Sequence, residues 1–521
     1  MYSVSQALAR TVIRRITWKE RRYHAATQQY SEGISLYTVD AIYRTCHEAP
    51  TRTALVYNLE PISYRAFYAR IAAMIAFLDE QPLRPGGVAV VWIDHILVSW
   101  LVDLALRSLG HTTLSIRSAS ELSELGDLDV VAFVTLAGEG HTAQHAAALS
   151  DAPRVEIHRG ATLPLDTTLE PPAPPVRAEG EHIMLTSGTT GHYKMVLYDL
   201  ERQAQARELG EAMVADHRKV SDRPPMLHLF DFGLWTAAGY GSPPVLWSLG
   251  CAVAFHQGAD KARSLDVPGL THAMVTPALL ADLMAAPEGA FRRNDDLSLR
   301  IIAGALSEDL YNRATARLTR KITTTVGSTE GGAIARTTVN SAEDLRWHKL
   351  DPDAVVEVVD ENDRPLPPGK LGQLRVRQAE GVDRYINDAD ASAAAFRDGW
   401  FYPGDLAVLD GQRRLSLLGR VTDVINVRGD KHAARPFEEA LESDLGAAVC
   451  LLSEQAKSGA EELHAVIETP APIDEATLQA VAAHRLAGFG TIHFHFVDRL
   501  PRNHLGKVER FKLRASLAQH R

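Results

Sequence analysis

The chain has 521 residues, of which 45% are hydrophobic and 23% charged, a composition typical of globular proteins with large buried cores. Lys and Arg number 55 against 65 Asp and Glu, and the resulting net charge of −10 disfavours a nucleic-acid-binding surface. The three cysteines, Cys46, Cys251 and Cys450, are far apart and have no metal-ligand spacing, so we expect no disulfide framework and a reducing compartment.

The beginning of the chain, MYSVSQALARTVIRRITWKERRYH (1–24), mixes apolar residues with many arginines and has no continuous apolar stretch. It lacks the pattern of a secretory signal, and we expect a solvated extension or a basic amphipathic surface helix. The most apolar helix candidate, ILVSWLVDLALRSLG (96–110), contains Asp103 and Arg107 and is too short to span a bilayer. We therefore expect a soluble cytoplasmic protein without a membrane span.

Strands and helices alternate along the first third of the chain. ALVY (54–57) has the pattern of a short strand, and Ser63 can cap a helix whose apolar positions recur at helical spacing. After the breaker RPGG, VAVVWI (88–93) is a continuous apolar strand of the buried type. Further strands are expected after the next helix, at 111–116 and 129–136. This alternation predicts an α/β protein with mostly parallel sheets.

The chain also contains a connector and a change of texture near its end. The proline-rich stretch EPPAPPVRAEGEH (170–182) cannot form regular structure and is expected to be a stiff connector to the strand HIML (182–185). Near Leu418 the pattern changes, and we expect a small α+β unit from there to Arg521.

The loop after the strand at 182–185, TSGTTGHYK (186–194), combines glycines, hydroxyls and a lysine. Glycines let a ligand approach the main chain, hydroxyls donate to anionic oxygens, and a lysine supplies a charge suited to phosphate. The spacing is not that of the P-loop, because Gly188 and Gly191 are too close and two residues separate Gly191 from Lys194. Taken alone, the loop is weak evidence, since most such stretches are solvated connections.

The stretch 186–194 resembles the phosphate loop of the adenylate-forming superfamily, which includes acyl- and aryl-CoA ligases, peptide-synthetase adenylation domains and luciferase-like enzymes. Later segments resemble other motifs of that superfamily in the expected order. They are IIAGALSEDL (301–310, a degraded adenine-side segment), TTVGSTEGG (324–332, the Y-G-x-T-E segment), DGWFYPGDLAVLD (398–410, the G-W-F-x-T-G-D segment), LGRVTDVINVRGDK (418–431, the hinge segment) and LPRNHLGKVERFKLR (500–514, the C-terminal lysine motif). The ordered set is specific, and the chain is identified as a divergent member.

The resemblance implies a fold and a reaction. We expect an N-terminal extension (1–35), a large ATP- and acid-binding domain (36–419), a hinge (420–423) and a small mobile C-terminal α+β domain (424–521). The implied reaction uses ATP and Mg²⁺ to convert a carboxylic acid to an acyl-adenylate with release of pyrophosphate. The acyl group then passes to a thiol, such as coenzyme A or the phosphopantetheine arm of a carrier protein.

The resemblance also implies a role for each matching residue. Glu330 would hold Mg²⁺, Thr329 would touch the α-phosphate, and Asp405 would accept hydrogen bonds from the ribose hydroxyls. Lys507 would reach the α-phosphate and the carboxylate together. Thr329, Glu330 and Lys507 are the predicted catalytic residues. The predicted cofactor-binding residues are Thr186, Ser187, Gly188, Thr189, Thr190, Gly191, Lys194, Gly304, Ala305, Val326, Gly327, Ser328, Asp405 and Arg420.

Three positions depart from the superfamily's pattern. Thr422 stands where the hinge has a charged residue, Val326 where an aromatic ring stacks on adenine, and Tyr193 where a proline stiffens the phosphate loop. Glu330, Asp405 and Lys507 are present, which favours a divergent enzyme over an inactive one.

The segment LFDFGLW (229–235) bears on the identity of the acid and supports two interpretations. It resembles the segment of amino-acid-activating domains in which an aspartate, here Asp231, pairs with the α-amino group. It also resembles the aromatic pocket helix of acyl- and aryl-CoA ligases, with Asp231 capping that helix; we favour this one, which suits a flat or alicyclic acid. The predicted substrate-binding residues are Phe230, Asp231, Gly233 and Gly331.

Two further features leave alternatives open. The histidines of HFHF (493–496) lie on one face of a strand, and we expect packing there because no third metal ligand is visible. The acceptor can be coenzyme A, a carrier protein acting in trans or an amine that gives an amide, and the protein can be a monomer or a homodimer. The rival from another class is a nucleotide-binding regulator that adenylates nothing.

Overall fold

The computed structural model describes residues 37–122, 125–139, 152–158, 170–175, 178–187, 193–377, 382–427, 430–455, 461–487, 489, 491–502 and 508–519. The N-terminal extension, the loop residues Gly188, Thr189, Thr190 and Gly191, and Lys507 lie outside these ranges.

The first sheet has six strands in the order β6-β5-β3-β4-β7-β8, and every neighbouring pair except β7 and β8 is parallel. Its strands are β3 (Val88–Trp92), β4 (Thr112–Ser115), β5 (Val130–Leu136), β6 (Arg154–Ile157), β7 (His182–Ser187) and β8 (Tyr193–Tyr198). The strands expected at 88–93, 111–116, 129–136 and 182–185 are therefore confirmed to within a few residues.

The second sheet has eight strands in the order β14-β13-β12-β11-β9-β10-β1-β2, parallel from β13 to β1 and antiparallel at both edges. Its strands are β1 (Thr53–Tyr57), β2 (Glu60–Ser63), β9 (Met226–His228), β10 (Ala252–Phe255), β11 (His272–Val275), β12 (Ser298–Ile301), β13 (Ile322–Ser328) and β14 (Gly332–Thr338). Two sheets with long parallel runs confirm the α/β class expected from the alternating pattern.

Helices cover these sheets and enclose the main cores. They are α2 (Thr38–Glu48), α3 (Tyr64–Asp79), α4 (Ile96–Ser108), α5 (Ala119–Leu122), α7 (Leu200–Arg218), α8 (Ala237–Gly241), α9 (Pro243–Ser248), α10 (Pro277–Ala285) and α11 (Glu308–Arg317), with 3₁₀ turns at Lys261–Asp266 and Glu343–Leu345. As expected, Ser63 caps α3 by accepting a hydrogen bond from the Ala66 amide at 3.2 Å. The largest core packs the inner faces of α2, α3 and α4 against residues of both sheets, such as Val91 and Phe255.

The two charges inside the apolar helix α4 are buried, and the connector satisfies one of them. Arg107 is fully buried and pairs with Glu179 at 2.8 Å, while its Nε donates to the Gly180 carbonyl at 2.8 Å. Asp103 accepts from the Thr113 hydroxyl at 2.5 Å. The described parts of the proline-rich connector have no regular structure, as expected, and these bonds fix its end against α4.

A third, antiparallel sheet joins the large domain to the end of the chain. It contains β15 (His348–Lys349), β16 (Val355–Val359), β17 (Leu371–Arg377), β18 (Phe396–Arg397), β19 (Trp400–Phe401), β20 (Asp405–Leu409) and β21 (Arg414–Arg420), with α12 (Ala389–Ala395) before β18.

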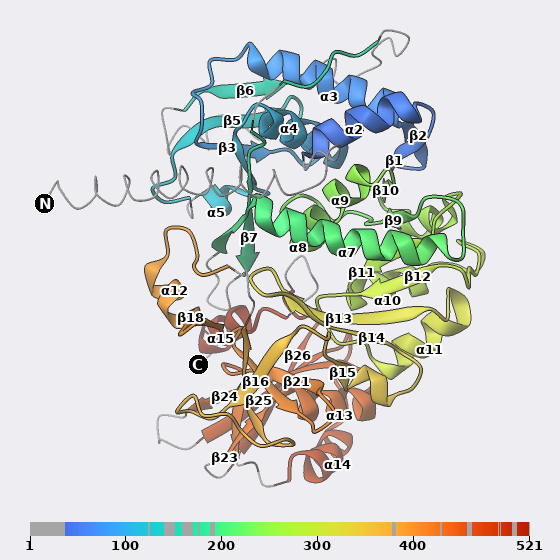
Figure 1. Ribbon diagram of the computed structural model, residues 1–521. Helices are drawn as coiled ribbons and strands as arrows, with labels where there is room; N and C mark the ends of the chain where they lie inside the picture. Colours follow the sequence, from blue (N-terminus) through green and yellow to red (C-terminus); the bar gives the residue numbers. More distant parts are fainter. Residues whose placement is uncertain are drawn as a thin grey trace, which may run out of the picture.

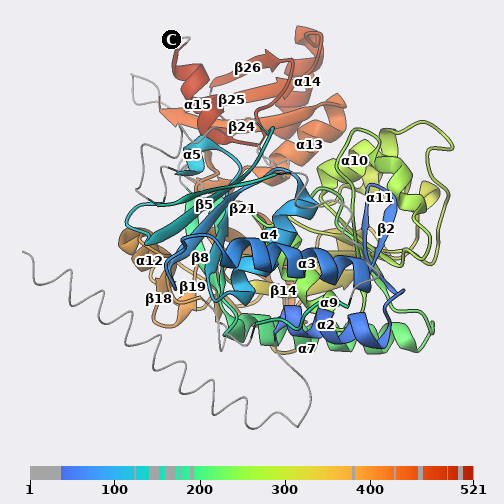
Figure 2. The same ribbon diagram turned by 90° about the horizontal axis from the view of Figure 1, so that it is seen from above.

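The last hundred residues form a smaller α+β domain with its own core, in which Ile425 and Leu441 pack against Leu451 and Ala465. Its elements are β22 (Val424–Val427), β23 (Asp430–Ala433), α13 (Arg435–Leu445), β24 (Ala448–Gln455), β25 (Glu461–Glu468), α14 (Glu475–Arg485), β26 (Thr491–Val497) and α15 (Arg510–Gln519). Figures 1 and 2 show these red elements gathered on the side of the molecule away from α2 and α3. Among the described residues, no helix has the length and apolarity needed to cross a bilayer.

Candidate active site

The two ends of the predicted phosphate loop lie side by side. β7 ends in Thr186 and Ser187, β8 begins with Tyr193 and Lys194, and the antiparallel register pairs Thr186 with Lys194. The sequence folds this way because an apolar strand enters the loop and a second one leaves it. Lys194 is therefore fixed at the mouth of the loop, opposite a hydroxyl residue.

Glu330 contacts this loop at Thr186 and a segment farther along the chain at Tyr385. Its Oε1 accepts a hydrogen bond from the Thr186 hydroxyl at 3.2 Å and another from the Tyr385 hydroxyl at 2.9 Å. Lys194 Nζ lies 4.7 Å from the centroid of the Tyr385 ring. Both hydrogen bonds fall on one carboxylate oxygen, and no described residue bonds to Oε2, so the residues present fit an oxygen-seeking ion such as Mg²⁺ bound next to the loop.

The segment that carries Glu330 is held from the helix side by an arginine that the sequence analysis did not identify. Arg202 of α7 donates to the Thr329 carbonyl at 2.5 Å, and its burial lowers the pKa of its guanidinium without removing the charge. The Ser328 hydroxyl accepts from the Gly331 amide at 2.9 Å, which closes the turn around Thr329 and Glu330. In the sequence Arg202 is one charge among many on a surface helix, so no local signal marks it.

The glycines of this segment permit close backbone contacts. A Cβ on Gly327 would lie 2.3 Å from the Gly332 carbonyl oxygen, at the irregular register between β13 and β14. Val326 packs against the core of the third sheet. Gly304 and Ala305 are exposed in the turn between β12 and α11. These predicted residues thus lie on β13 and in the turn that follows the neighbouring strand β12.

Asp405 and Arg420 face one another across β20 and β21. Arg420 Nε lies 3.2 Å from Asp405 Oδ1, and both side chains are partly exposed. The arginine therefore orients the carboxylate predicted to bind ribose, and it is the first residue of the predicted hinge. This contact joins two residues that the sequence analysis assigned separately.

Three of the four predicted substrate residues follow the carboxyl end of β9 and differ in exposure, whereas Gly331 lies between β13 and β14. Phe230 is fully buried with φ of 51° and stacks on His228, with ring centroids 4.0 Å apart. Asp231 pairs with Lys261 at 2.5 Å. A Cβ on Gly233 would lie 2.3 Å from the Trp235 ring, so the glycine gives that indole its place.

The suggestion that Asp231 caps the following helix is wrong. The cap of α8 is Thr236, whose hydroxyl accepts from the Gly239 amide at 2.9 Å. The chain makes turns between Asp231 and Thr236, so the helix begins later than the sequence suggested.

These predicted residues share one edge of the fold. β9, β12 and β13 run parallel in the second sheet, so the residues that follow them lie at the same carboxyl edge. Ligands of parallel α/β sheets bind at this edge. The predicted adenine and acid residues and the segment of Thr329 and Glu330 therefore lie at one edge of the second sheet, and the hydrogen bond between Thr186 and Glu330 brings the phosphate loop of the first sheet to it.

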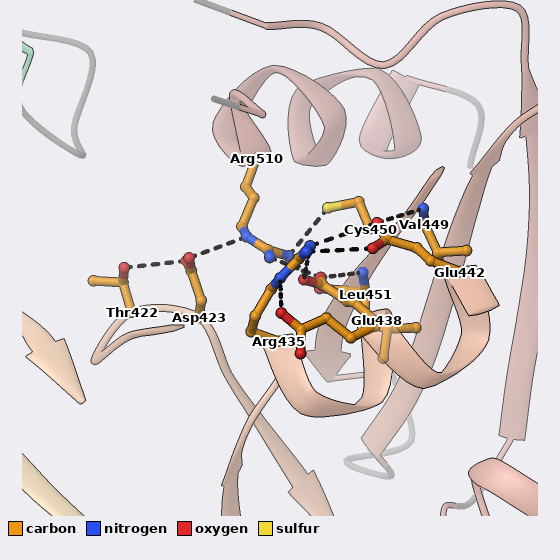
Figure 3. Close-up of polar contacts among 10 residues, drawn as sticks. Thr422, Asp423, Arg435, Glu438, Glu442, Val449, Cys450, Leu451 and Arg510 are labelled. Carbon is orange, nitrogen blue, oxygen red and sulfur yellow. Dashed lines mark hydrogen bonds and ion pairs between the residues drawn. The ribbon is translucent and has the colours of Figure 1, made fainter. Parts of the chain in front are cut away.

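The predicted hinge is tied to the segment after the predicted lysine by Arg510, the first residue of α15 (Figure 3). Arg510 Nε lies 3.0 Å from Asp423 Oδ2, and Nη2 lies 2.7 Å from Glu438 Oε1. Nη1 donates to the Leu451 carbonyl at 2.7 Å. One guanidinium thus joins the hinge, α13 and β24.

Lys507 itself lies outside the described residues, but the residues on both sides of its segment are described. Arg502 and Val508, which flank the segment, form an isolated antiparallel bridge, and α15 follows at Arg510. The segment that carries the lysine therefore begins and ends at fixed points of the small domain.

Comparisons with known proteins show the family and the fold of the chain. The sequence model of the family described as AMP-binding enzyme matches residues 42–386. The chain is 25% identical to enterobactin synthase component E of Escherichia coli, over 91% of this chain and 93% of that protein. It is 26% identical to 2-succinylbenzoate–CoA ligase of Bacillus licheniformis, over 73% of this chain and 82% of that one. The structure of ATP-bound MatB from Rhodopseudomonas palustris has the same fold, with a TM-score of 0.76 and 20% identity over 92% of this chain and 98% of that one.

Proposed function

The chain belongs to the AMP-binding enzyme family, whose members form acyl-adenylates with ATP, and on this premise we propose that it activates a flat or alicyclic carboxylic acid and transfers the acyl group to a thiol. The convergence of Thr186, Lys194 and Tyr385 around Glu330 carries the proposal. Binding of a triphosphate requires a metal ligand, a cation and hydrogen-bond donors in one place. The Glu330 carboxylate, Lys194 and the glycine-rich loop supply these three groups.

The described residues support an assignment of roles. Thr186 and Lys194, with the loop between them, would hold the β- and γ-phosphates, and Glu330 would hold Mg²⁺. Bound Mg²⁺ would neutralise phosphate charge during attack by the acid. Asp405, oriented by Arg420, would accept hydrogen bonds from the ribose hydroxyls.

The surroundings of Asp231 favour an acid without an α-amino group. This carboxylate is already paired with Lys261, so an ammonium group of the substrate would have to displace a bound cation. Trp235 is half-buried beside Gly233 and offers an aromatic surface for a flat acid. An amino-acid-activating enzyme is the alternative that this ion pair disfavours.

Coenzyme A is the acceptor we propose first, because one relative is a CoA ligase by name and matches most of the chain. A phosphopantetheine arm on a separate carrier protein offers the same thiol chemistry. Direct transfer to an amine is the other outcome that the acceptor test must distinguish.

ATP–pyrophosphate exchange with aryl, alicyclic, fatty and amino acids tests the proposal. Exchange with an aryl or alicyclic acid and not with amino acids is expected, and Glu330→Gln should abolish it. Coenzyme A, a phosphopantetheine-bearing carrier protein and simple amines are then added to the active mixture, and the acylated product is identified by mass spectrometry.

Exchange restricted to amino acids would overturn the proposed acid class but leave adenylate formation intact. Absence of exchange with every acid, combined with tight binding of ATP, would instead favour a nucleotide-binding regulator. An amide product with no thioester would overturn the proposed acceptor.

A further inference from the structure

Three histidines and a glutamate gather on one face of the small sheet formed by β24, β25 and β26. His464 on β25 is the register partner of His493 on β26, and Glu462 and His495 lie two residues away on the same face. The opposite face, with Leu463 and Phe494, forms the core of the small domain. The four polar side chains therefore lie away from that core, and two strands contribute them.

The ligand atoms of three of these residues are close enough to share an ion. One ligand atom from each of Glu462, His464 and His493 lies within 4.8 Å of the other two. His493 Nε2 is 3.6 Å from Glu462 Oε2. The same nitrogen is enclosed and makes no hydrogen bond to any described residue.

The fourth residue of the cluster, His495, contacts His464. His464 Nδ1 lies 2.9 Å from His495 Nε2, and the two rings are 5.2 Å apart. A histidine that binds a metal through one nitrogen usually donates its other ring N–H to a nearby acceptor, which fixes the ring. His495 supplies such an acceptor when its own proton is on Nδ1.

We propose that Glu462, His464 and His493 form a binding site for a divalent transition-metal ion of the zinc type, with His495 fixing the ring of His464. Imidazole nitrogens and a carboxylate oxygen are typical zinc ligands, whereas Mg²⁺ prefers oxygen alone. Three protein ligands leave the fourth tetrahedral position for water.

The present distances require a modest contraction. Bonds of about 2.0–2.2 Å place tetrahedral ligand atoms roughly 3.3 Å apart, so separations of up to 4.8 Å must close by as much as about 1.5 Å. The His493 and Glu462 side chains are 41% and 25% exposed, so both can move, and solvent can deliver the ion. The rings of His464 and His493 are stacked 4.9 Å apart at 21°, and the exposed His493 ring would turn toward the ion.

The proposed site lies on the small domain, whereas Glu330, the proposed magnesium ligand, lies on the large domain. A bound ion would join β25 to β26, the strand that leads to the loop of Lys507. Since binding to the native state alone stabilises that state, the ion would stabilise the small domain.

The test uses the full chain, free of any affinity tag and stripped with a chelator. Isothermal titration with Zn²⁺ should show about one saturable site, and His493→Ala should weaken its affinity at least about tenfold. His495→Gln should weaken it by about tenfold, as second-layer partners of ligating histidines do. His484→Ala is the matched control, because His484 is an exposed histidine of α14 outside the cluster.

A second readout reports on the geometry and on folding. Co²⁺ should give the intense visible absorption of a tetrahedral site in the wild type and lose it in His493→Ala. Zn²⁺ should raise the melting temperature of the wild type but not of that variant, while Mg²⁺ leaves both unchanged. Equal Zn²⁺ affinity in wild type and His493→Ala, an equal loss in His484→Ala, or no saturable binding in the wild type would overturn the proposal.

Discussion

At the scale of single residues, Tyr385 is the most informative side chain of the candidate site. Burial and, after it, the charge of Glu330 raise the pKa of Tyr385, so its hydroxyl stays protonated and remains a donor. The hydroxyl binds Glu330 while the ring faces Lys194. One residue thus orients both the proposed metal ligand and the proposed phosphate-binding cation.

Tyr385→Phe separates these two functions, because it removes the hydroxyl and keeps the ring. A hydrogen bond to a charged group contributes about 1.5–3 kcal/mol, and we expect roughly a tenfold loss in kcat/KM for ATP in the exchange assay, since the site is partly open to solvent. Tyr311→Phe is the control. Tyr311 lies on α11 and its hydroxyl donates to the Val339 carbonyl at 3.3 Å, and we expect the loss of this hydroxyl to change kcat/KM by less than about twofold. Equal activity of Tyr385→Phe and the wild type would show that Glu330 needs no such partner.

The sequence predicted residues of the candidate site only where they belong to a local sequence motif. Glu330 and Lys194 stand in recognisable segments, whereas Tyr385 and Arg202 act through contacts with residues far away in the chain. His464 is the same case: of the two histidines in HFHF only His493 is a proposed ligand, and the other two, Glu462 and His464, come from the neighbouring strand β25, which only the strand register reveals. Such partners follow from tertiary packing and leave no periodic signal.

At the scale of elements, the predictions from the sequence agree closely with the structure where a segment's own residue pattern determines its conformation. The buried strand β3 and the capped helix α3 follow from apolar periodicity and one serine. The start of α8 was missed because turns separate Asp231 from Thr236, and the turn residues gave no clear signal. The packing of α15 on the hinge was also beyond the sequence, because Arg510 resembles the other basic residues of the tail.

Arg510→Ala tests whether this arginine holds α15 to the hinge. The Glu438 side chain is only 2% exposed, and removal of Arg510 leaves this buried carboxylate with the longer ion pair to Arg435 at 4.0 Å, so we expect a cost of about 3 kcal/mol, the lower end of the range for a broken buried pair. We expect a marked drop in the melting temperature of the small domain, with a partial rescue by Arg510→Lys. Arg485→Ala removes a solvent-screened pair with Asp444 and should lower the melting temperature far less. Equal melting temperatures for Arg510→Ala and Arg485→Ala would contradict the role of Arg510.

At the scale of the whole molecule, the chain divides the proposed chemistry between two bodies. The large domain contributes the loop, Glu330 and Asp405, and the small domain contributes the segment of Lys507. The connection passes through the hinge after β21, where Arg420 pairs with Asp405 and Asp423 pairs with Arg510. One end of the predicted hinge is thus paired with the proposed ribose-binding carboxylate, and the other end is paired with the helix that follows the segment of Lys507. The proposed domain boundaries place the hinge at 420–423, between these two ion pairs.

This division predicts that Lys507 serves one half-reaction. Positive charge placed where charge develops in a transition state contributes about a hundred- to thousandfold in rate, so Lys507→Ala should lose adenylate formation by at least about a hundredfold. Transfer of the acyl group from a pre-formed adenylate should stay within about threefold of the wild type, because rigid-body rotation of the small domain would present another face for that step. The two rates are measured separately, by pyrophosphate exchange and by single-turnover thioester formation.

Lys512→Ala is the matched control for Lys507→Ala. Lys512 lies on α15, the helix that follows the segment of Lys507; its side chain is half exposed, and it pairs with Glu509, the residue directly before that helix. Loss of one exposed lysine changes the charge of the tail as Lys507→Ala does, but removes no group from the proposed site. Equal loss of adenylation in both variants would attribute the effect to the basic tail as a whole. Equal loss of both half-reactions in Lys507→Ala alone would instead place the lysine in a site shared by the two steps and remove the need for domain rotation.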